Sequence, residues 1–215
     1  MAQSRSDEHT PGRYRALAPL YDLVSLEHLL YREGRKAAVH AAHLEEGQCV
    51  LDVGCGTGLT MPLIAKPLGP HGQLVGIDPS PAMLAQARKR HVETPRTLIH
   101  SEAHRLSPEI LAHHHVTGPI HVALFCYTLS VMSDRTQAWD NVLSLLPPGA
   151  RIVIVDVAPP TTGGAPARLM ARILARIGGS DIDSRPWKKL QSACTHIEHH
   201  NFTGGHVQMW AGNLK

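Results

Sequence analysis

Two acidic residues and a glycine-rich turn stand near one another in the sequence and could form a nucleotide-type site. Asp52 comes just before three alternating glycines, Gly54, Gly56 and Gly58, and Asp78 closes the later run Q-L-V-G-I-D. Glycine lets the backbone approach a bound molecule, and the N–H groups at the start of a following helix point to the same place. An acidic side chain at the Asp78 spacing can hold both hydroxyls of a ribose. The pattern predicts a site for an adenosine-like ligand.

The spacing of the glycines separates this turn from a pyrophosphate-binding loop. Dinucleotide-binding loops carry G-x-G-x-x-G, whereas residues 54–58 read G-C-G-T-G. The carboxylate of Asp52 would repel a pyrophosphate, but it can accept hydrogen bonds, directly or through water, from a cationic amine such as that of S-adenosylmethionine (SAM). The alternative interpretation is a NAD-binding domain, or a non-nucleotide α/β domain with a chance glycine loop.

Two stretches resemble the first two motifs of the class I SAM-dependent methyltransferases, namely V-L-D-V-G-C-G-T-G at 50–58 and G-I-D-P-S-P-A-M-L at 76–84. Residues 13–24, R-Y-R-A-L-A-P-L-Y-D-L-V, are similar to the N-terminal lid of small-molecule members, including quinone C-methyltransferases and bacterial phospholipid N-methyltransferases. The resemblance implies an α/β fold, with a doubly wound, mostly parallel seven-stranded sheet that ends in an antiparallel hairpin. It also implies SAM as cofactor and S-adenosylhomocysteine (SAH) as product.

The resemblance places cofactor contacts at the ends of several predicted strands. Asp78 corresponds to the ribose ligand, Glu102 to the residue that contacts the adenine amine, and the N–H of Ala103 to the cap on the ring, although S-E-A stands here in place of the usual G-D-A. No metal is required. The implied cofactor residues are Asp52, Gly54, Cys55, Gly56, Thr57, Gly58, Asp78, Pro79, Met83, Glu102, Ala103 and Tyr127.

Methyl transfer from a sulfonium depends largely on placing the acceptor in line with the methyl group. A weakly acidic acceptor would also need a base whose pKa lies near the working pH. The candidate catalytic residues are Tyr127, Asp156 and Tyr21, besides a histidine on a loop. In the family the lid folds over the cofactor, which would bring Tyr21 and Asp22 to the substrate. The alternative is a scaffold helix with Tyr21 in the core.

Apolar periodicity and turn residues indicate the elements that carry these side chains. Strands are expected at 50–53, 73–77, 96–100, 122–126 and 151–155, with a hairpin of 195–203 and 206–211. Helices are expected at 59–66 (stopped by Pro67), 81–92 (capped by Ser80), 166–177 and 186–193 (capped by Asp183 or Ser184), after Ser107 and Asp134, and as short pieces within 13–44 broken at Pro19 and Gly34. Because ligands gather at the carboxyl ends of parallel strands, one crevice should hold Asp52, Cys55, Asp78, Glu102, Tyr127 and Asp156.

Composition limits the class of protein. We expect one globular unit of 215 residues, with a tail and lid helices at 1–45 and a SAM-binding catalytic domain at 46–215. Four cysteines without a C-x-x-C pair indicate reduced thiols and a cytoplasmic location, and no apolar run approaches the roughly 20 residues that span a bilayer. A net charge of +3 and an aromatic content of 4% argue against nucleic acid as a partner. The 16 histidines are read as surface residues, with a metal carrier using His196, His199 and His200 as the alternative.

The pattern of residues 166–177 predicts a basic amphipathic helix. Its apolar side carries Leu169, Ile173 and Ile177, and another side carries Arg168, Arg172 and Arg176. Such a helix could lie on an anionic membrane or cover a lipophilic substrate; the alternative is a packed helix with a solvated arginine edge. The predicted function is methylation of a small, lipophilic acceptor, a phospholipid amine or a quinol, in the cytoplasm or at the inner face of the membrane. A SAM-binding protein without catalysis, and a methyltransferase for a polar metabolite, are the alternatives. The sequence leaves the oligomeric state and the methylated atom open.

Overall fold

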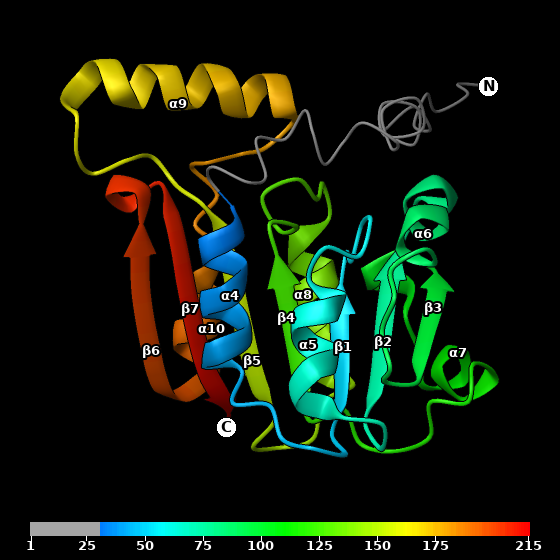
Figure 1. Cartoon of the computed structure of the whole chain (residues 1–215). Helices are drawn as coiled ribbons and strands as arrows, with labels where there is room; N and C mark the ends of the chain where they lie inside the picture. The colour runs from blue at the N-terminus through cyan, green and yellow to red at the C-terminus, as the bar shows by residue number, and fades with distance from the viewer. Residues whose placement is uncertain (1–30) are drawn as a thin grey trace, which may run out of the picture.

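The computed structural model describes residues 31–215, and its centre is a sheet of seven strands (Figure 1). The strand order is β3-β2-β1-β4-β5-β7-β6. The pairs from β3 to β5 are parallel, and β7 runs antiparallel to both β5 and β6. The sheet is therefore the doubly wound, mostly parallel one that was predicted. The candidate residues Tyr21 and Asp22 lie outside the described residues.

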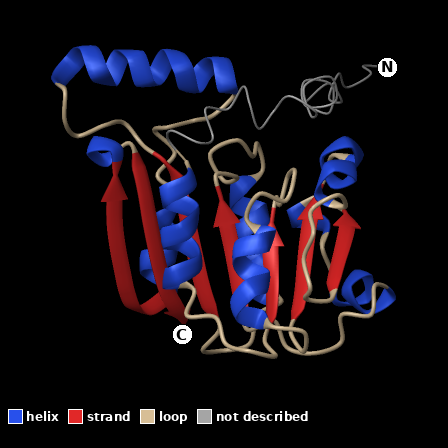
Figure 2. Cartoon of the chain, viewed as in Figure 1, coloured by secondary structure: helices blue, strands red, loops and turns tan. Residues whose placement is uncertain are grey.

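Helices cover both faces of this sheet (Figure 2). The strands are β1 Cys49–Val53, β2 Gln73–Asp78, β3 Arg96–His100, β4 Val122–Cys126, β5 Arg151–Val157, β6 Cys194–Phe202 and β7 Val207–Leu214. The described helices are α4 Arg32–Ala41, α5 Met61–Leu68, α6 Pro81–Ala87, α7 Pro108–His113, α8 Arg135–Ser144, α9 Gly164–Gly178 and α10 Trp187–Ala193, with 3-10 turns η1 Ala103–Arg105 and η2 Thr203–Gly205.

The central strands are buried on both faces. Every residue of β1 and β5 is buried. Alternate side chains of β1 pack toward opposite sides: Leu51 and Val53 join a cluster with α7, α8 and α10, and Val50 joins a cluster with α4, α5 and α6. Strands buried in this way are continuous apolar runs, so the carboxylate of Asp52 within β1 is an exception that needs a reason.

Serine caps begin two helices as predicted. The Ser80 hydroxyl accepts a hydrogen bond from the Met83 N–H at the start of α6, and the Ser107 hydroxyl accepts one from the Ile110 N–H at the start of α7. In both helices proline occupies the first position, where no intrahelical N–H is needed.

The helix after the glycine turn does not stop where the sequence predicts. α5 contains Pro67 in its last turn and ends at Leu68. A proline so near the end removes only one N–H from the helix, and the chain then leaves it through Gly69, at φ +63. The predicted stop at Pro67 is therefore wrong by two residues.

Two other helix ends are set by contacts that are distant in sequence. α6 ends at Ala87 and not near Val92, because the Arg96 guanidinium donates hydrogen bonds to the carbonyl oxygens of Ala87 and Arg90, each at 2.9 Å. α10 has Pro186 as its N-cap, so the predicted caps are wrong.

The two residues expected to cap α10 have other partners. Asp183 pairs with Arg172 of α9 at 3.1 Å, and the Ser184 hydroxyl donates to the Asp181 carbonyl. Their side chains therefore stabilise the connection between α9 and α10, and they do not cap α10.

The described part of the predicted lid is the unbroken helix α4, which runs through Gly34. The expected break at this glycine is wrong. A Cβ at Gly34 would clash with the Tyr127 hydroxyl and would lie 2.9 Å from Cγ1 of Val207. Glycine is present because α4 packs closely on the sheet, where it contacts β5 and β7. A domain boundary at residue 45 stays a prediction.

The C-terminal hairpin closes the sheet, and its outer strand is irregular. The pairing of β6 with β7 shifts between Thr195 and Glu198, and His196 within the shift has φ +48. The His199 ring stacks on Trp210, with centroids 3.9 Å apart. Within residues 31–215, no three His, Cys, Asp or Glu side chains are grouped so as to hold a metal ion.

Helix α9 covers residues Gly164–Gly178, slightly more than predicted, and lies across the carboxyl end of the sheet above β5, β6 and β7 (Figure 1). None of the helices of the described region combines the length and the apolar character needed to cross a membrane.

Candidate functional site

The glycine turn between β1 and α5 has a backbone that requires glycine. Gly54, Gly56 and Gly58 have φ values of +67, +55 and +76, in the left-handed region. A Cβ at Gly54 would clash with the Thr128 hydroxyl, and one at Gly58 would lie 3.1 Å from the Cβ of Ala87. A Cβ at Gly56 would meet no atom of the described residues within 4 Å. Gly54 and Gly58 therefore serve packing, whereas Gly56 faces open space through which a ligand can approach.

Asp78, at the end of β2, ties this turn to the next helix. Its Oδ2 accepts the Gly56 N–H at 2.9 Å, and its Oδ1 accepts the Ser80 N–H at 2.8 Å. Burial raises the pKa of the Asp78 carboxyl, and these two amide bonds oppose the rise. Each carboxylate oxygen has a second lone pair, so both can still accept a hydroxyl.

Asp52 is a buried carboxylate that lacks hydrogen-bond partners within residues 31–215. Its side chain is 1% exposed, and neither carboxylate oxygen has a hydrogen-bond partner in the described part of the chain. Burial raises its pKa to about 7; Arg35 opposes this rise and Asp78 adds to it. Buried polar groups are nearly always hydrogen-bonded. A cationic N–H donor from a ligand would supply the missing partner, so the residues present fit the amine of SAM.

Arg35 of α4 was not predicted as a site residue. Its guanidinium carbon lies 5.1 Å from the ring centroid of Tyr127, and its charge lowers the pKa of Asp52. The run R-E-G-R-K looks like a solvated helix start, and only the glycine at position 34 signals that this face is in close contact with another element.

Tyr127 follows β4 in a conformation that is rare for a non-glycine residue, with φ +55. Its N–H donates to the Val155 carbonyl at 2.7 Å, and its hydroxyl donates to the Tyr31 carbonyl at 3.0 Å. The centroids of the Tyr31 and Tyr127 rings lie 4.7 Å apart. The structure thus fixes Tyr127 between the end of β4 and the start of α4, and a catalytic role for it stays a prediction.

Asp156 does not face the crevice as predicted. Its side chain is 0% exposed; Oδ2 accepts the Ser130 N–H at 2.9 Å and Oδ1 accepts the Val157 N–H at 2.8 Å. Burial raises its pKa to about 6, against these hydrogen bonds. The carboxylate therefore orders the loop after β4, and the expectation that it reaches the rim as a base is wrong because its oxygens point into this loop.

Glu102 and Ala103 follow β3 as predicted. The Glu102 carboxylate is half-exposed and pairs with Arg105 at 2.9 Å and His104 at 3.5 Å. Ala103 is buried, and its carbonyl accepts from the Asn141 amide at 2.8 Å. The loop is thus anchored to α8. If Glu102 contacts the adenine, its carboxylate must bind both the adenine amine and Arg105.

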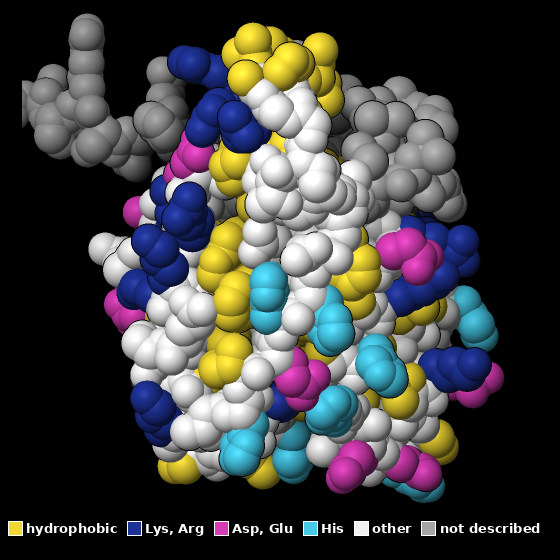
Figure 3. All heavy atoms as spheres, turned by 90° about the vertical axis from the view of Figure 1, so that its left-hand side faces the viewer, with side chains coloured by type: hydrophobic (Ala, Val, Ile, Leu, Met, Phe, Trp, Pro, Cys, Tyr) yellow, Lys and Arg dark blue, Asp and Glu magenta, His cyan; other side chains and the backbone are white. Residues whose placement is uncertain are grey.

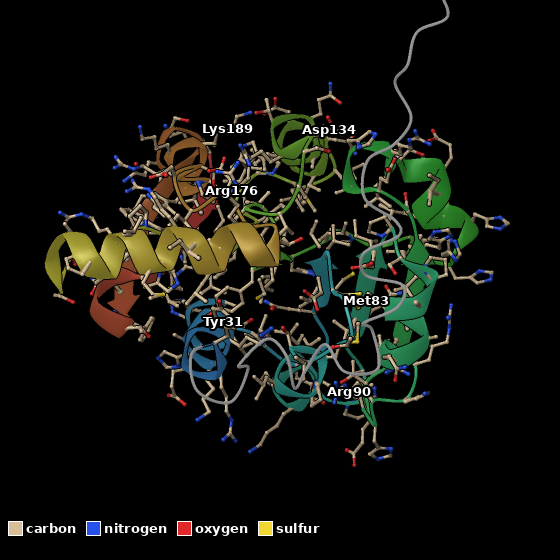
Figure 4. All side chains as sticks on the ribbon, turned by 90° about the horizontal axis from the view of Figure 1, so that it is seen from above. Tyr31, Met83, Arg90, Asp134, Arg176 and Lys189 are labelled. Carbon is tan, nitrogen blue, oxygen red and sulfur yellow. The ribbon has the colours of Figure 1, made fainter. Side chains whose placement is uncertain are left out.

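The remaining predicted cofactor residues surround the glycine turn. The Cys55 N–H donates to the Ile77 carbonyl at 2.9 Å, and burial raises the pKa of the Cys55 thiol well above its usual value. The Thr57 carbonyl accepts a hydrogen bond from Arg90 at 3.0 Å, so this arginine connects the segment after α6 to the glycine turn. Seen from above, Met83 lies on the α6 side of the carboxyl rim and Tyr31 on the α4 side, next to α9 (Figure 4).

A family model for the methyltransferase domain matches residues 51–152, which carry the glycine turn and the ends of β1 to β4. Among curated relatives, a 2-phytyl-1,4-naphtoquinone methyltransferase of Thermosynechococcus vestitus is 32% identical over 151 residues, which are 69% of this chain and 64% of that relative. The chain therefore spans less than two thirds of that protein's length.

Two further similarities cover more of the chain. The ubiquinone/menaquinone biosynthesis C-methyltransferase UbiE of Syntrophotalea carbinolica is 25% identical, over 97% of this chain and 95% of the relative. The solved structure of the N-methyltransferase NodS from Bradyrhizobium japonicum in complex with SAH superposes with a TM-score of 0.59 at 17% identity, over 85% of this chain and 86% of that one. The second likeness is one of fold.

Proposed function

Because the chain carries a class I SAM-dependent methyltransferase domain, we propose that it transfers the methyl group of SAM to a small lipophilic acceptor, a quinol or a phospholipid amine. The observation that carries the proposal is the buried carboxylate of Asp52, which has no hydrogen-bond partner within residues 31–215 and precedes a glycine turn that leaves open space at Gly56. A buried carboxylate without a hydrogen-bond donor destabilises the folded state. A ligand that supplies a donor offsets this loss of stability.

In this proposal the chain binds the ammonium and the ribose of the cofactor through two carboxylates. When bound, SAM supplies an electrophilic methyl group on a sulfonium. Asp52 accepts hydrogen bonds from its ammonium, directly or through water, and Asp78 accepts those of the ribose hydroxyls. Glu102 and Ala103 serve the adenine, and Gly56 leaves room for the backbone to touch the ligand.

Arg35 extends this scheme to the carboxylate of the same amino-acid end. An ammonium and a carboxylate are the two charges of the methionine half, and Asp52 and Arg35 are a matching pair within electrostatic range of each other. A guanidinium recognises a carboxylate well because its donors form a planar fork.

Two observations support a lipophilic acceptor. The relatives described above are methyltransferases of phytyl-naphthoquinone and of ubiquinone or menaquinone biosynthesis. In addition, the Tyr31 and Tyr127 rings belong to an apolar cluster with the buried Ala171 of α9, at the end of β4. Tyr127 is proposed to position the acceptor, and Tyr21, if the lid folds as in the family, to approach it from the other side. Peripheral contact with the inner face of a membrane through residues 166–177 belongs to the same proposal, because a lipophilic acceptor resides in the bilayer.

The test is an acceptor screen with SAM labelled in its methyl group. A quinol, phosphatidylethanolamine vesicles and a set of small polar amines are compared, and both labelled product and SAH are measured. Strongest labelling of the quinol or the phospholipid is expected. Strongest labelling of polar amines would assign a polar metabolite as acceptor. SAH binding without SAH release from any acceptor would indicate a SAM-binding protein without catalysis.

A further inference from the structure

Helix α9 exposes an apolar surface that is unusual for this molecule. Leu169, Met170, Ile173 and Leu174 are 61%, 56%, 47% and 53% exposed. Together with Ile197 of β6, at 40%, they are the exposed large hydrophobic side chains of the described region. Single exposed apolar residues are ordinary, whereas a contiguous group on one helix marks an interaction surface.

The charge on this helix has one sign. α9 carries Arg168, Arg172 and Arg176 and no acidic residue. Arg172 pairs with Asp183 at 3.1 Å, while Arg168 and Arg176 have no ion pair within residues 31–215. Exposed leucines next to unpaired arginines fit a surface that offers both hydrocarbon and negative charge.

The inner side of α9 reaches the proposed site. Ala171 is 8% exposed and packs with Val157 and Ile182, and the same cluster includes the Tyr31 and Tyr127 rings. The helix lies across the carboxyl end of the sheet (Figure 1) and beside Tyr31 when seen from above (Figure 4). Whatever binds the outer side of α9 is therefore held next to the tyrosines.

Glycines in the left-handed region stand at both ends of α9. The N-cap Gly163 and the first helical residue Gly164 have φ values of +79 and +66, and the C-cap Gly179 has φ +78. In the side view, apolar side chains gather at the α9 end of the molecule, whereas histidines occupy the lower part of the same face (Figure 3). Four of the five exposed large hydrophobic side chains of the described region thus lie on α9, and the fifth, Ile197, lies on β6.

We propose that α9 docks this protein on an anionic lipid surface, with Leu169, Met170, Ile173 and Leu174 entering the interface and Arg168 and Arg176 contacting lipid phosphates. This inference rests on the proposed function, since it states how the site reaches an acceptor within a bilayer. A lipid surface accounts for both the apolar and the cationic side chains, whereas a second copy of this chain would place like-charged arginines together.

The experiment is flotation of the full chain with vesicles of phosphatidylcholine alone or mixed with phosphatidylglycerol. Binding to the mixed vesicles, weakened by salt, is expected. The double variant Leu169→Ser/Ile173→Ser should lose about tenfold or more in binding, whereas Ile197→Ser, on β6, should bind as the wild type does. Arg168→Gln/Arg176→Gln should also bind anionic vesicles more weakly than its charge-matched control, Arg88→Gln/Lys89→Gln.

Three results would overturn the proposal: no vesicle binding, equal binding to neutral and anionic vesicles, or full binding by both α9 variants. An α9-dependent dimer in analytical ultracentrifugation without lipid would assign the surface to a second copy instead. Circular dichroism checks that each variant folds. Calorimetry with SAH separates the two proposals, because α9 variants that bind SAH normally but not vesicles support docking. Absence of SAH binding in the wild type would remove the proposed function and leave the docking result standing.

Discussion

The two halves of the carboxyl rim hold their polar groups in different ways. Around β1 and β2, the Asp78 carboxylate binds amides that lie 22 and 2 residues away. Around β4 and β5, the Tyr127 hydroxyl donates to the Tyr31 carbonyl, 96 residues away, and Arg35 of α4 lies over the Tyr127 ring. The half that we propose to bind the cofactor (the cofactor half) is thus built from a local motif. The half that we propose to bind the acceptor (the acceptor half) depends on helices that are distant in the sequence. The difference teaches that a sequence motif can predict the residues of the cofactor half but says little about those of the acceptor half.

The largest effect is expected from Gly54→Ala in the cofactor half. The new Cβ would clash with the Thr128 hydroxyl at φ +67, so the free energy of unfolding should fall by about 2–4 kcal/mol and SAH binding should be lost. Gly47→Ala is the matched control, because it has φ +83 and no described atom within 4 Å of its Cβ; it should cost about 1 kcal/mol. Chemical denaturation and calorimetry measure both. Equal costs would show that backbone strain alone, and not packing on the acceptor half, fixes this glycine.

Asp78→Asn should weaken SAH binding by about 100-fold, since hydrogen bonds to a charged group contribute about 1.5–3 kcal/mol each. Adenosine, which has the same ribose, should lose as much affinity. Asp134→Asn, on the exposed start of α8, is the control and should leave both affinities unchanged. Unchanged SAH affinity of Asp78→Asn in calorimetry would contradict the ribose assignment.

Asp52 should make both stability and cofactor binding depend on pH. Its folded pKa of about 7 lies above its usual 3.8, so the folded state favours the protonated form. With respect to this group, the wild type is then most stable below about pH 4. Its free energy of unfolding falls by up to about 4 kcal/mol as the pH rises from there through 7. Asp52→Asn should abolish this part of the pH dependence in thermal denaturation.

The same carboxyl should release a proton when a cation binds beside it. At pH 6, the binding enthalpy of SAM should differ between buffers of different ionisation enthalpy, and the difference should disappear in Asp52→Asn. A buffer-independent enthalpy in the wild type would count against the Asp52–ammonium contact.

Arg35→Met should weaken SAH binding by about tenfold, while 5′-methylthioadenosine, which lacks the amino-acid end, should bind the variant and the wild type equally. Lys36→Met, at the neighbouring exposed position that pairs with Glu33, is the control. Equal losses for both ligands would mean that Arg35 acts through the packing of Tyr127 and not through the carboxylate.

The smallest effect is expected from Tyr127→Phe in the acceptor half. Loss of the hydrogen bond to the Tyr31 carbonyl should cost about 1 kcal/mol of stability. If Tyr127 only positions the acceptor, kcat should keep its pH profile in the variant. A lost pH limb would instead assign it the role of a base.

The sequence predicts the sheet well because buried parallel strands are short apolar runs between turn residues. The strands at 73–77, 96–100 and 122–126 fall within one residue of the observed β2, β3 and β4. Helix ends are harder to predict, since they depend on side chains elsewhere. Arg96 ends α6, and the close approach of α4 to Tyr127 keeps Gly34 within a helix.

For the site, the sequence by itself determined the glycine turn, Asp52 and Asp78, because φ values above zero and a carboxylate in an apolar strand are read from residue type and spacing. Only the tertiary structure decided that Asp156 turns inward, that Arg35 stands beside Tyr127, and that α9 keeps its leucines exposed. The physical reason is that a local motif fixes its own backbone, whereas the direction of a side chain and the exposure of a helix face depend on which distant elements pack against them.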